Sequence, residues 1–367
     1  MRYLLLPLTL LFGFVLFVSP AQPCSRILWN NNDRCVLVGR NMDWFTDLHS
    51  NIWVLPRGMQ RTGLASANPL TWKSKYGSIA ITGYDSVTAD GLNEKKLAVH
   101  MLYLQQTSVT SRNAKTPGMC ISLWAQYYLD NFATVAEAVE AWQTNPYQLL
   151  MAIEPTSKMP VTVHLALNDS TGDSAILEYI GGEMKIYHDR NYTVMTNEPP
   201  FAEQLKNLQQ YEGFGGKKPL PGTNEPDDRF VRGAFYAAHL PKPKSDREAI
   251  ASLMSVMRNV SGPMGASTDP ARPNVSMTIW RTITDLSNGV LYYDGVLSPQ
   301  VFWLSLNELN FDPNQPVRKL TVVDNFDLGG DVKDKLETAP MFHFLAPEES
   351  PAATEPSNIH ELPAPAL

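Results

Sequence analysis

Short strand-like runs, bounded by turn signals and interleaved with helical periodicity, fill the chain between residues 24 and 344 without an internal repeat or linker. The turn signals include Asn-Asn-Asn-Asp at residues 30–33 and the pair Gly181-Gly182. We predict strands at residues 26–30, 36–40, 52–55, 78–82, 97–104, 161–167, 175–180, 184–188, 275–282, 289–293 and 301–305. We predict helices at residues 121–131, 135–143 (behind Thr134 as N-cap), 201–211, 229–239 and 246–259. Many hairpins with packed helices indicate antiparallel sheets covered by helices, a layered α+β domain.

Charge and motif content exclude several classes of function. The 367 residues carry 30 basic and 37 acidic side chains, so no basic surplus exists for a nucleic-acid partner. The seven histidines show no ligand-like spacing, and no zinc-protease, C-x-x-C or phosphate-loop signature occurs, so we expect no metal and no cofactor. A Ser–His–Asp triad stays open, because such triads are recognised by geometry rather than by order in the sequence.

The N-terminus has the layout of an export signal. Arg2 precedes an uncharged apolar run at residues 3–18, and Ser19-Pro20-Ala21 supplies small residues for cleavage after Ala21. We predict a signal peptide at residues 1–21, a short propeptide at 22–23, and a periplasmic or secreted protein that is not inserted in a membrane after processing. A retained membrane anchor is the alternative.

The C-terminus differs in composition from the domain. Residues 345–367 hold five prolines, four glutamates, no aromatic residue and no lysine or arginine. Such a stretch buries too little apolar surface to offset its ordering entropy. We therefore predict one domain at residues 24–344 and a disordered tail at 345–367.

Cys24 stands at the junction between the export segment and the domain. A cysteine at a free N-terminus can use its own α-amino group, whose reference pKa is about 8, as the base for its thiol. In the next predicted strand, Arg40 would favour the thiolate by its charge and Asp43 would hydrogen-bond the α-ammonium. On spacing alone, three alternatives remain: an acylated lipoprotein cysteine, a structural cysteine, and an ordinary Arg40–Asp43 surface ion pair.

Six short motifs in order resemble the choloylglycine hydrolase family, which includes bile salt hydrolases and penicillin V acylases. They are Cys24-Ser-Arg, Gly39-Arg-Asn-Met-Asp-Trp44, Thr88-Ala-Asp-Gly-Leu-Asn-Glu-Lys95, Val194-Met-Thr-Asn-Glu-Pro199, Asp228-Arg-Phe-Val-Arg232 and Thr278-Ile-Trp-Arg-Thr282. The resemblance covers nearly all of residues 24–325 and is closest to exported Gram-negative members. It implies an N-terminal-nucleophile hydrolase with a four-layer αββα sandwich, and an autoproteolytically released Cys24.

The resemblance also implies roles for individual residues. Cys24 matches the nucleophile, and Arg40 and Asp43 match the two charged residues beside it. Asn197 matches an asparagine whose side-chain amide donates to the oxyanion, and Tyr103 falls where the backbone N–H gives a second donor. Arg229 matches an arginine that supports the nucleophile. Without the resemblance, the sequence is also compatible with Asn197 as a turn residue, Tyr103 as a core residue, and Arg229 as an ion-pair partner of its neighbouring aspartates.

Departures from the family pattern are few. Ser25 replaces a common threonine, and Lys96 replaces a glycine, which matters if the turn needs a positive φ. The aromatic side chain of Tyr103 is that of acylase-type members. Cys35 and Cys120 are compatible with a disulfide or with two buried thiols.

The resemblance implies an amidase for small acyl-amide substrates with linear, non-peptide C–N bonds. We rank penicillin V first, N-acyl-homoserine lactones second and conjugated bile salts third. A homo-oligomer, a tetramer by resemblance, is expected. A non-catalytic, lipid-anchored binding protein on the same fold is the alternative from another class.

Overall fold

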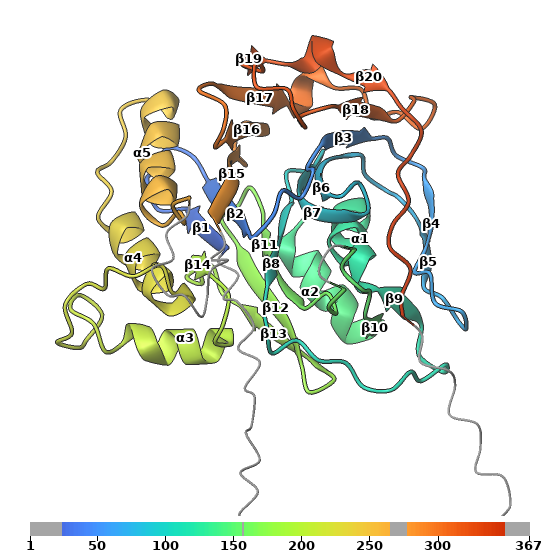
Figure 1. Cartoon of the computed structure of the whole chain (residues 1–367), viewed down its shortest axis with the longest axis horizontal. Helices are drawn as coiled ribbons and strands as arrows, with labels where there is room; N and C mark the ends of the chain where they lie inside the picture. The colour runs from blue at the N-terminus through green and yellow to red at the C-terminus, as the bar shows by residue number, and fades with distance from the viewer. Residues whose placement is uncertain (1–23, 156–157, 265–276, 349–367) are drawn as a thin grey trace, which may run out of the picture.

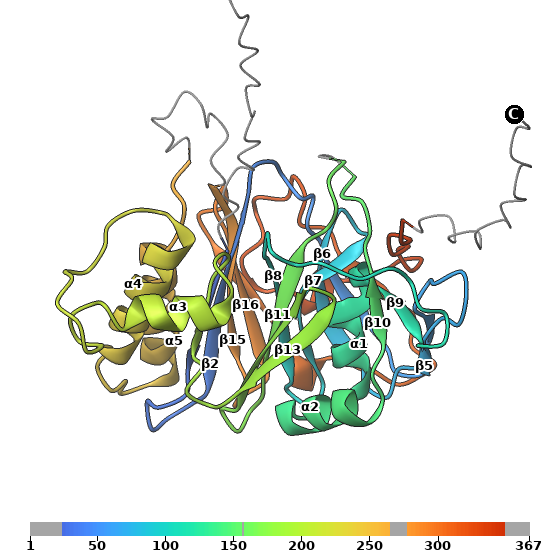
Figure 2. The ribbon, with the colours of Figure 1, turned by 90° about the horizontal axis from the view of Figure 1, so that it is seen from below.

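Two large sheets stack face to face, and each is covered on its outer side by helices (Figures 1 and 2). The computed structural model describes residues 24–155, 158–264 and 277–348. The first sheet has the order β14 (Val194–Met195), β1 (Ser25–Trp29), β2 (Leu37–Trp44), β15 (Met277–Asp285), β16 (Val290–Gly295), β17 (Val301–Ser305) and β19 (Gly330–Asp331). The second has the order β13 (Glu183–His188), β12 (Ser174–Ile180), β11 (Val163–Asn168), β8 (Ala98–Tyr103), β7 (Val87–Asn93), β6 (Ser78–Gly83), β3 (Ile52–Leu55), β18 (Arg318–Leu320) and β20 (Glu337–Thr338).

The helices form the two outer layers. Helices α4 (Pro226–Ala238) and α5 (Asp246–Asn259) pack on β1 and β2, and α3 (Phe201–Leu208) packs on α4. Helices α1 (Trp124–Asn131) and α2 (Val135–Thr144) cover the second sheet. The remaining elements are two strand pairs and three short 3-10 helices: β4 (Gln60–Thr62) with β5 (Thr71–Lys73), β9 (Gly118–Cys120) with β10 (Gln148–Leu150), η1 (Ile121–Leu123), η2 (Leu306–Glu308) and η3 (Lys333–Lys335). The four-layer αββα sandwich is confirmed.

The hairpin of β1 and β2 brings the N-terminal cysteine beside the family-like motif on β2. Asn32 closes the turn by accepting hydrogen bonds from the backbone N–H groups of Arg34 and Cys35, at 3.0 and 2.9 Å. The resulting register pairs Ser25 with Asn41. Cys24, one residue earlier, therefore lies opposite Met42, between Arg40 and Asp43 in the sequence of β2.

Most predicted elements form within a few residues of their expected bounds, and the differences have local causes. Helix α4 begins three residues before the predicted 229, because Pro226 occupies its first turn, where a missing N–H costs nothing. Strand β7 is absent from the prediction, because its sequence VTADGLN contains alanine, aspartate, glycine and asparagine, which are depleted in strands. The predicted N-cap Thr134 is confirmed and accepts a hydrogen bond from Glu137 N.

The predicted signal peptide and propeptide, and residues 349–367 of the predicted tail, lie outside the described residues. Residues 345–348 are described and bond to the domain: Leu345 N donates to Ser86 O at 3.0 Å. Cys35 and Cys120 are free, buried thiols in different hydrophobic clusters. In the described ranges, no helix is long and apolar enough to cross a membrane.

Candidate active site

Cys24 is the first described residue and is almost fully buried, at 1% exposure, at the edge of a cavity. Its backbone nitrogen donates to Asn197 Oδ1 at 2.5 Å, and its Sγ lies 3.6 Å from the carbonyl oxygen of Asp43. In the full chain this nitrogen belongs to the Pro23–Cys24 peptide bond. Burial raises the pKa of the Cys24 thiol, and the nearby guanidinium groups of Arg40 and Arg229 oppose that rise. The thiol is therefore protonated until a base is supplied beside it.

Arg229, on the first turns of α4, contacts three parts of the site at once. Its Nη1 donates to Cys24 O at 2.5 Å and to Ser25 Oγ at 2.6 Å, and its Nη2 donates to Asn197 Oδ1 at 2.8 Å. Its Nε donates to the carbonyl of Asn224, at 2.9 Å, which fixes the side chain to its own loop. The planar guanidinium makes four directed bonds that an ammonium group could not reproduce.

Asn197 follows β14 and faces Tyr103 at the end of β8. Its Nδ2 donates to Tyr103 O at 2.8 Å, so the amide nitrogen points toward β8. Leu104 N donates to Thr162 O, so Leu104 and Thr162 form a hydrogen-bonded pair of the antiparallel ladder. In the neighbouring pair, Tyr103 and Val163, the backbone groups of the two residues therefore point away from each other. Within an extended strand, the N–H and C=O of one residue point to the same side. The backbone N–H of Tyr103 is thus directed toward the side of Asn197.

Arg40 lies on the face of β2 that is turned toward the second sheet. Its Nη2 donates to Met101 O at 2.6 Å, its Nε lies 3.4 Å from Asp90 Oδ2, and its guanidinium lies over the ring of Trp280 at 4.6 Å. Asp90 in turn contacts His100 Nδ1 at 2.9 Å. Arg40, Asp90 and His100 are all fully buried, so the cation near Cys24 is held by a carboxylate on β7.

Asp43 lies on the opposite face of β2 from Arg40, since successive strand residues alternate. The side chain is fully buried, and among the described residues no group makes a well-aligned hydrogen bond to either carboxylate oxygen. Burial raises the pKa of Asp43 to about 6, and this rise is opposed by the charge of Arg229, by the hydroxyl group of Thr278 near the carboxylate and by the charge of Arg40. A buried carboxylate without a well-aligned donor is unusual, because burial of an unpaired charge costs free energy. A cation or an N–H group that forms next to it would remove this cost.

Four buried residues that sequence reasoning did not single out hold the predicted ones in place. Besides Asp90 and His100, they are His164 and Glu178. His164 contacts Glu178 Oε1 at 3.1 Å and Thr196 O at 2.7 Å, and Glu178 also accepts from Phe201 N at 2.9 Å. These contacts fix the segment that carries Asn197. Asp90 stands inside the motif at residues 88–95, which is the one sequence signal that could have identified it.

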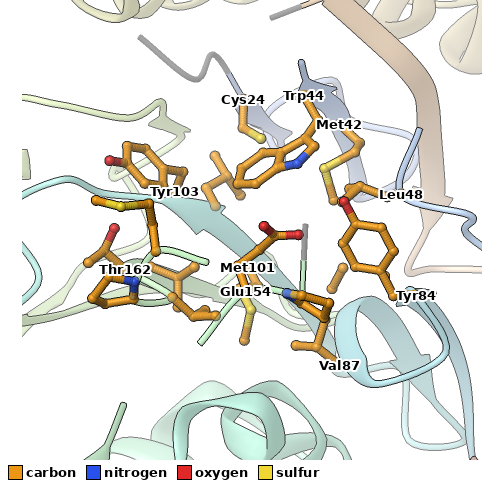
Figure 3. A pocket seen from close by; sticks show the side chains of 18 of the residues that line it. Cys24, Met42, Trp44, Leu48, Tyr84, Val87, Met101, Tyr103, Glu154 and Thr162 are labelled. Atoms are coloured by element: carbon orange, nitrogen blue, oxygen red, sulfur yellow. The ribbon is translucent and has the colours of Figure 1, made fainter. Parts of the chain in front are cut away.

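A cavity of about 490 Å³ opens from Cys24 and is lined mainly by apolar and aromatic side chains (Figure 3). Trp44 and Tyr103 lie near the cysteine, whereas Val87 and Tyr84 lie toward the other end of the view. Polar groups reach the cavity from Arg40, Gln105, Glu154 and Thr162; the other lining residues are Met42, Phe45, Leu48, Gly83, Ala89, Met101, Leu102, Pro155, Met159, Pro160, Val161, Val163 and Leu345. Such a cavity suits the apolar part of a small ligand, with the thiol at one end.

The structure brings all six predicted site residues together. Cys24, Arg40, Asp43, Asn197 and Arg229 form one buried cluster, and Tyr103 joins it through its main chain. Among the described residues, no group of three or more histidine, cysteine, aspartate or glutamate side chains is arranged to hold a metal ion. The groups available near Cys24 are a nucleophilic sulfur, two guanidinium groups, a carboxylate and amide donors.

The sequence and the fold resemble those of known proteins. The sequence model of the linear amide C–N hydrolases, choloylglycine hydrolase family, matches residues 24–319. A penicillin V acylase from Pectobacterium atrosepticum is 39% identical over 311 residues, covering 79% of this chain and 82% of that protein. A bile salt hydrolase/transferase from Clostridium perfringens is 26% identical over 324 residues, covering 80% and 95%. The solved structure of a penicillin V acylase from Agrobacterium tumefaciens superposes with a TM-score of 0.79 at 44% identity, covering 88% of this chain and all of that one.

Proposed function

Because this chain belongs to the choloylglycine hydrolase family and is a linear amide C–N hydrolase, we propose that Cys24 is its nucleophile and is activated by its own α-amino group. The single observation that carries this assignment is the position of Cys24: its sulfur lines the cavity, while its nitrogen lies 2.5 Å from Asn197. Cleavage of the Pro23–Cys24 bond converts that nitrogen into an amine, whose reference pKa of about 8 suits a base near neutral pH.

The reaction follows from the groups around the sulfur. The α-amine takes the thiol proton, and the thiolate attacks the carbonyl carbon of the amide, giving a tetrahedral oxyanion. Asn197 Nδ2 and the backbone N–H of Tyr103 donate to that oxyanion. The C–N bond then breaks, the α-ammonium protonates the leaving amine, and a thioester remains on Cys24. Water, deprotonated by the α-amine, hydrolyses the thioester and releases the acid.

The charged residues support these steps without taking part in the proton transfers. Arg229 orients Asn197 and the Cys24 carbonyl, and Arg40 favours the thiolate by its charge. Asp43 is the counter-charge for the α-ammonium, and this role explains why its buried oxygens have no well-aligned donor in the described structure of the uncleaved chain.

We propose penicillin V-type phenoxyacyl amides as the first substrate class, N-acyl-homoserine lactones as the second and conjugated bile salts as the third. The apolar cavity with Trp44 and Tyr103 near the nucleophile supports an aromatic or aliphatic acyl group. Over the aligned residues, the two penicillin V acylases are 39% and 44% identical to this chain, against 26% for the bile salt hydrolase/transferase.

Maturation and location are part of the proposal. An export signal ends at Ala21, Gln22-Pro23 is then removed autocatalytically, and the mature enzyme is periplasmic or secreted. The apolar run at residues 3–18 and the small residues before Gln22 support this order of events. A homo-oligomer, a tetramer by resemblance, is the proposed assembly.

The test compares wild type with Cys24→Ala on one panel: penicillin V, an N-acyl-homoserine lactone and a glycine-conjugated bile salt. Cys35→Ala, which removes another buried thiol, is the matched control. We expect Cys24→Ala to abolish hydrolysis of every substrate that wild type cleaves, and Cys35→Ala to retain it. Full activity in Cys24→Ala would overturn the proposal, and an acylated, inactive Cys24 would favour the lipid-anchored binding protein.

A further inference from the structure

The last described segment of the chain, residues 339–348, returns from β20 to the wall of the cavity. In Figure 1 it descends from β20 past β4 and β5 to the side of β9. It lies beyond residue 319, where the match to the family ends. We call these residues the C-terminal strap. Its one contribution to the cavity lining is Leu345.

The strap is fixed to the domain by its main chain. Leu345 N donates to Ser86 O at 3.0 Å, and Leu345 O accepts from Ser122 Oγ at 2.8 Å and from Cys120 Sγ at 3.1 Å. Further along, Glu348 N donates to Met151 O at 2.9 Å. Both the N–H and the C=O group of Leu345 are therefore hydrogen-bonded, and these bonds fix the position of its side chain in the cavity wall.

That place is remote from the nucleophile. Ser86, which binds Leu345, directly precedes Val87, another lining residue. Val87 and Cys24 lie at opposite ends of the cavity in Figure 3. Since an acyl group bonded to Cys24 Sγ can only extend away from the sulfur, its far end points toward the wall that Val87 and Leu345 share.

We propose that Leu345 closes the far end of the acyl cavity and sets the longest acyl chain that the enzyme accepts. This inference rests on the proposed function of Cys24. Each methylene that enters an apolar cavity improves binding by about four-fold, so kcat/KM rises with chain length until the wall is reached. Beyond that length, an added methylene clashes with Leu345 or stays in water, and the rise ends.

The experiment measures kcat/KM for straight-chain acyl amides of one amine, from butanoyl to tetradecanoyl. Leu345→Trp fills the end of the cavity and Leu345→Ala opens it. Met341→Ala is the matched control, because Met341 lies on the same strap but packs against the cluster around Trp53, away from the cavity. We expect Leu345→Trp to lower kcat/KM by about ten-fold or more for the longest chains, with no change for butanoyl.

The other two variants test whether the chain-length optimum depends on the size of the side chain at position 345. Leu345→Ala should move the optimum to longer chains, and Met341→Ala should leave the optimum where wild type has it. A Leu345→Trp enzyme whose kcat/KM is unchanged, or lowered by one factor for all chain lengths, would overturn the assignment of Leu345.

A binding measurement separates failure of this inference from failure of the proposed function. If wild type hydrolyses none of the amides, the proposed function fails, and the wall is tested by calorimetry of fatty acids of increasing length on the Cys24→Ala chain. The affinity should rise with length and then level off, at a shorter length in the chain that also carries Leu345→Trp. Equal profiles for the two chains would overturn the inference.

Discussion

Nη2 of Arg229 donates to Oδ1 of Asn197 over 2.8 Å, and this bond decides which end of the asparagine amide faces the cavity side of β8. The same Oδ1 also accepts from Cys24 N. With the oxygen occupied by two donors, the amide nitrogen is left to face Tyr103, whose carbonyl takes one of its two hydrogens. The second hydrogen is the one we assign to the oxyanion, so Asn197 is oriented before the substrate arrives.

Removal of the Asn197 amide should therefore affect the rate more than binding. For Asn197→Ala we expect kcat to fall about 10²–10³-fold with little change in KM, because the donor acts on the transition state. Asn197→Asp keeps an acceptor for Arg229 but loses the donor, and it should be impaired at least as strongly. Steady-state kinetics on both variants check this, and a kcat within ten-fold of wild type in Asn197→Ala would exclude the role.

Asp43 should make the uncleaved chain less stable as the pH rises. Its pKa is raised to about 6 in the folded chain, against a reference of about 3.9 in an unfolded one. The folded chain therefore holds the proton more tightly, and stability falls between pH ~4 and ~6. In the full chain carrying Cys24→Ala, Asp43→Asn removes this penalty and should raise the free energy of unfolding above pH ~6 by on the order of 2 kcal/mol.

Urea unfolding of the Cys24→Ala chain, with and without Asp43→Asn, checks that expectation on both sides of the transition. Below pH ~4 the two proteins should differ little, because Asp43 is protonated in both the folded and unfolded chains. A stability difference that is the same at both pH values would contradict the burial of an unpaired carboxylate at this position.

Substitution of Asp90 should lower the free energy of unfolding far more than substitution of a partly exposed aspartate. It lies 3.4 Å from Arg40 and 2.9 Å from His100, all fully buried, so Asp90→Asn leaves a buried guanidinium without its counter-charge. We expect the free energy of unfolding to fall by about 3–5 kcal/mol. Because Arg40 then shifts relative to Cys24, the rate of thiol alkylation in the folded protein should fall as well.

The Asp173–His188 pair provides the control for Asp90. Its atoms are 2.8 Å apart, but 25% and 34% of the two side chains are exposed. Asp173→Asn should therefore cost less than about 1 kcal/mol and leave alkylation of Cys24 unchanged. Chemical denaturation and iodoacetamide kinetics measure both effects, and equal costs for the two substitutions would contradict the account of Arg40.

Lys96 adopts the left-handed conformation that the glycine of the family pattern would adopt freely. Its φ is 67°, and its Nζ donates to Ser287 O at 2.6 Å. Lys96→Ala keeps the backbone strain and loses the bond, whereas Lys96→Gly relieves the strain. We expect the glycine variant to be about 1 kcal/mol more stable than the alanine variant in thermal unfolding. An alanine variant that equals or exceeds the glycine variant would show that the turn tolerates a side chain without strain.

Local signals predicted much of the fold. The hairpin of β1 and β2 follows from the Asn-Asn-Asn-Asp turn, and the pairing of Cys24 with the residues of β2 follows from that hairpin. Helix starts followed from caps where a cap residue was recognised, as at Thr134. The start of α4 was missed because its N-cap, Glu225, makes no side-chain capping bond and the first turn begins with Pro226. Strand β7 was missed because its alanine, aspartate, glycine and asparagine are residue types that are depleted in strands.

The site could be assembled from the sequence only through the family resemblance. Asn197 is 173 residues from Cys24, and Arg229 is 205 residues from it, so no spacing rule connects them. Asp90 stands in the motif at residues 88–95, but the motif by itself does not show which of its residues contacts Arg40, and His164 lies in none of the six motifs. Leu345 fell inside the predicted tail, whose composition gave no hint that its first residue bonds to Ser86.

The identity of the first residue in the active protein tests the central claim most directly. Intact mass and N-terminal sequencing of the active protein, recovered through its export route, should show a chain that begins with unmodified Cys24. The free α-amine is required, because the structure offers no other base for the buried thiol among the described contacts of its sulfur. A fully active chain that still carries Gln22-Pro23, or that is acylated on Cys24, would contradict the account.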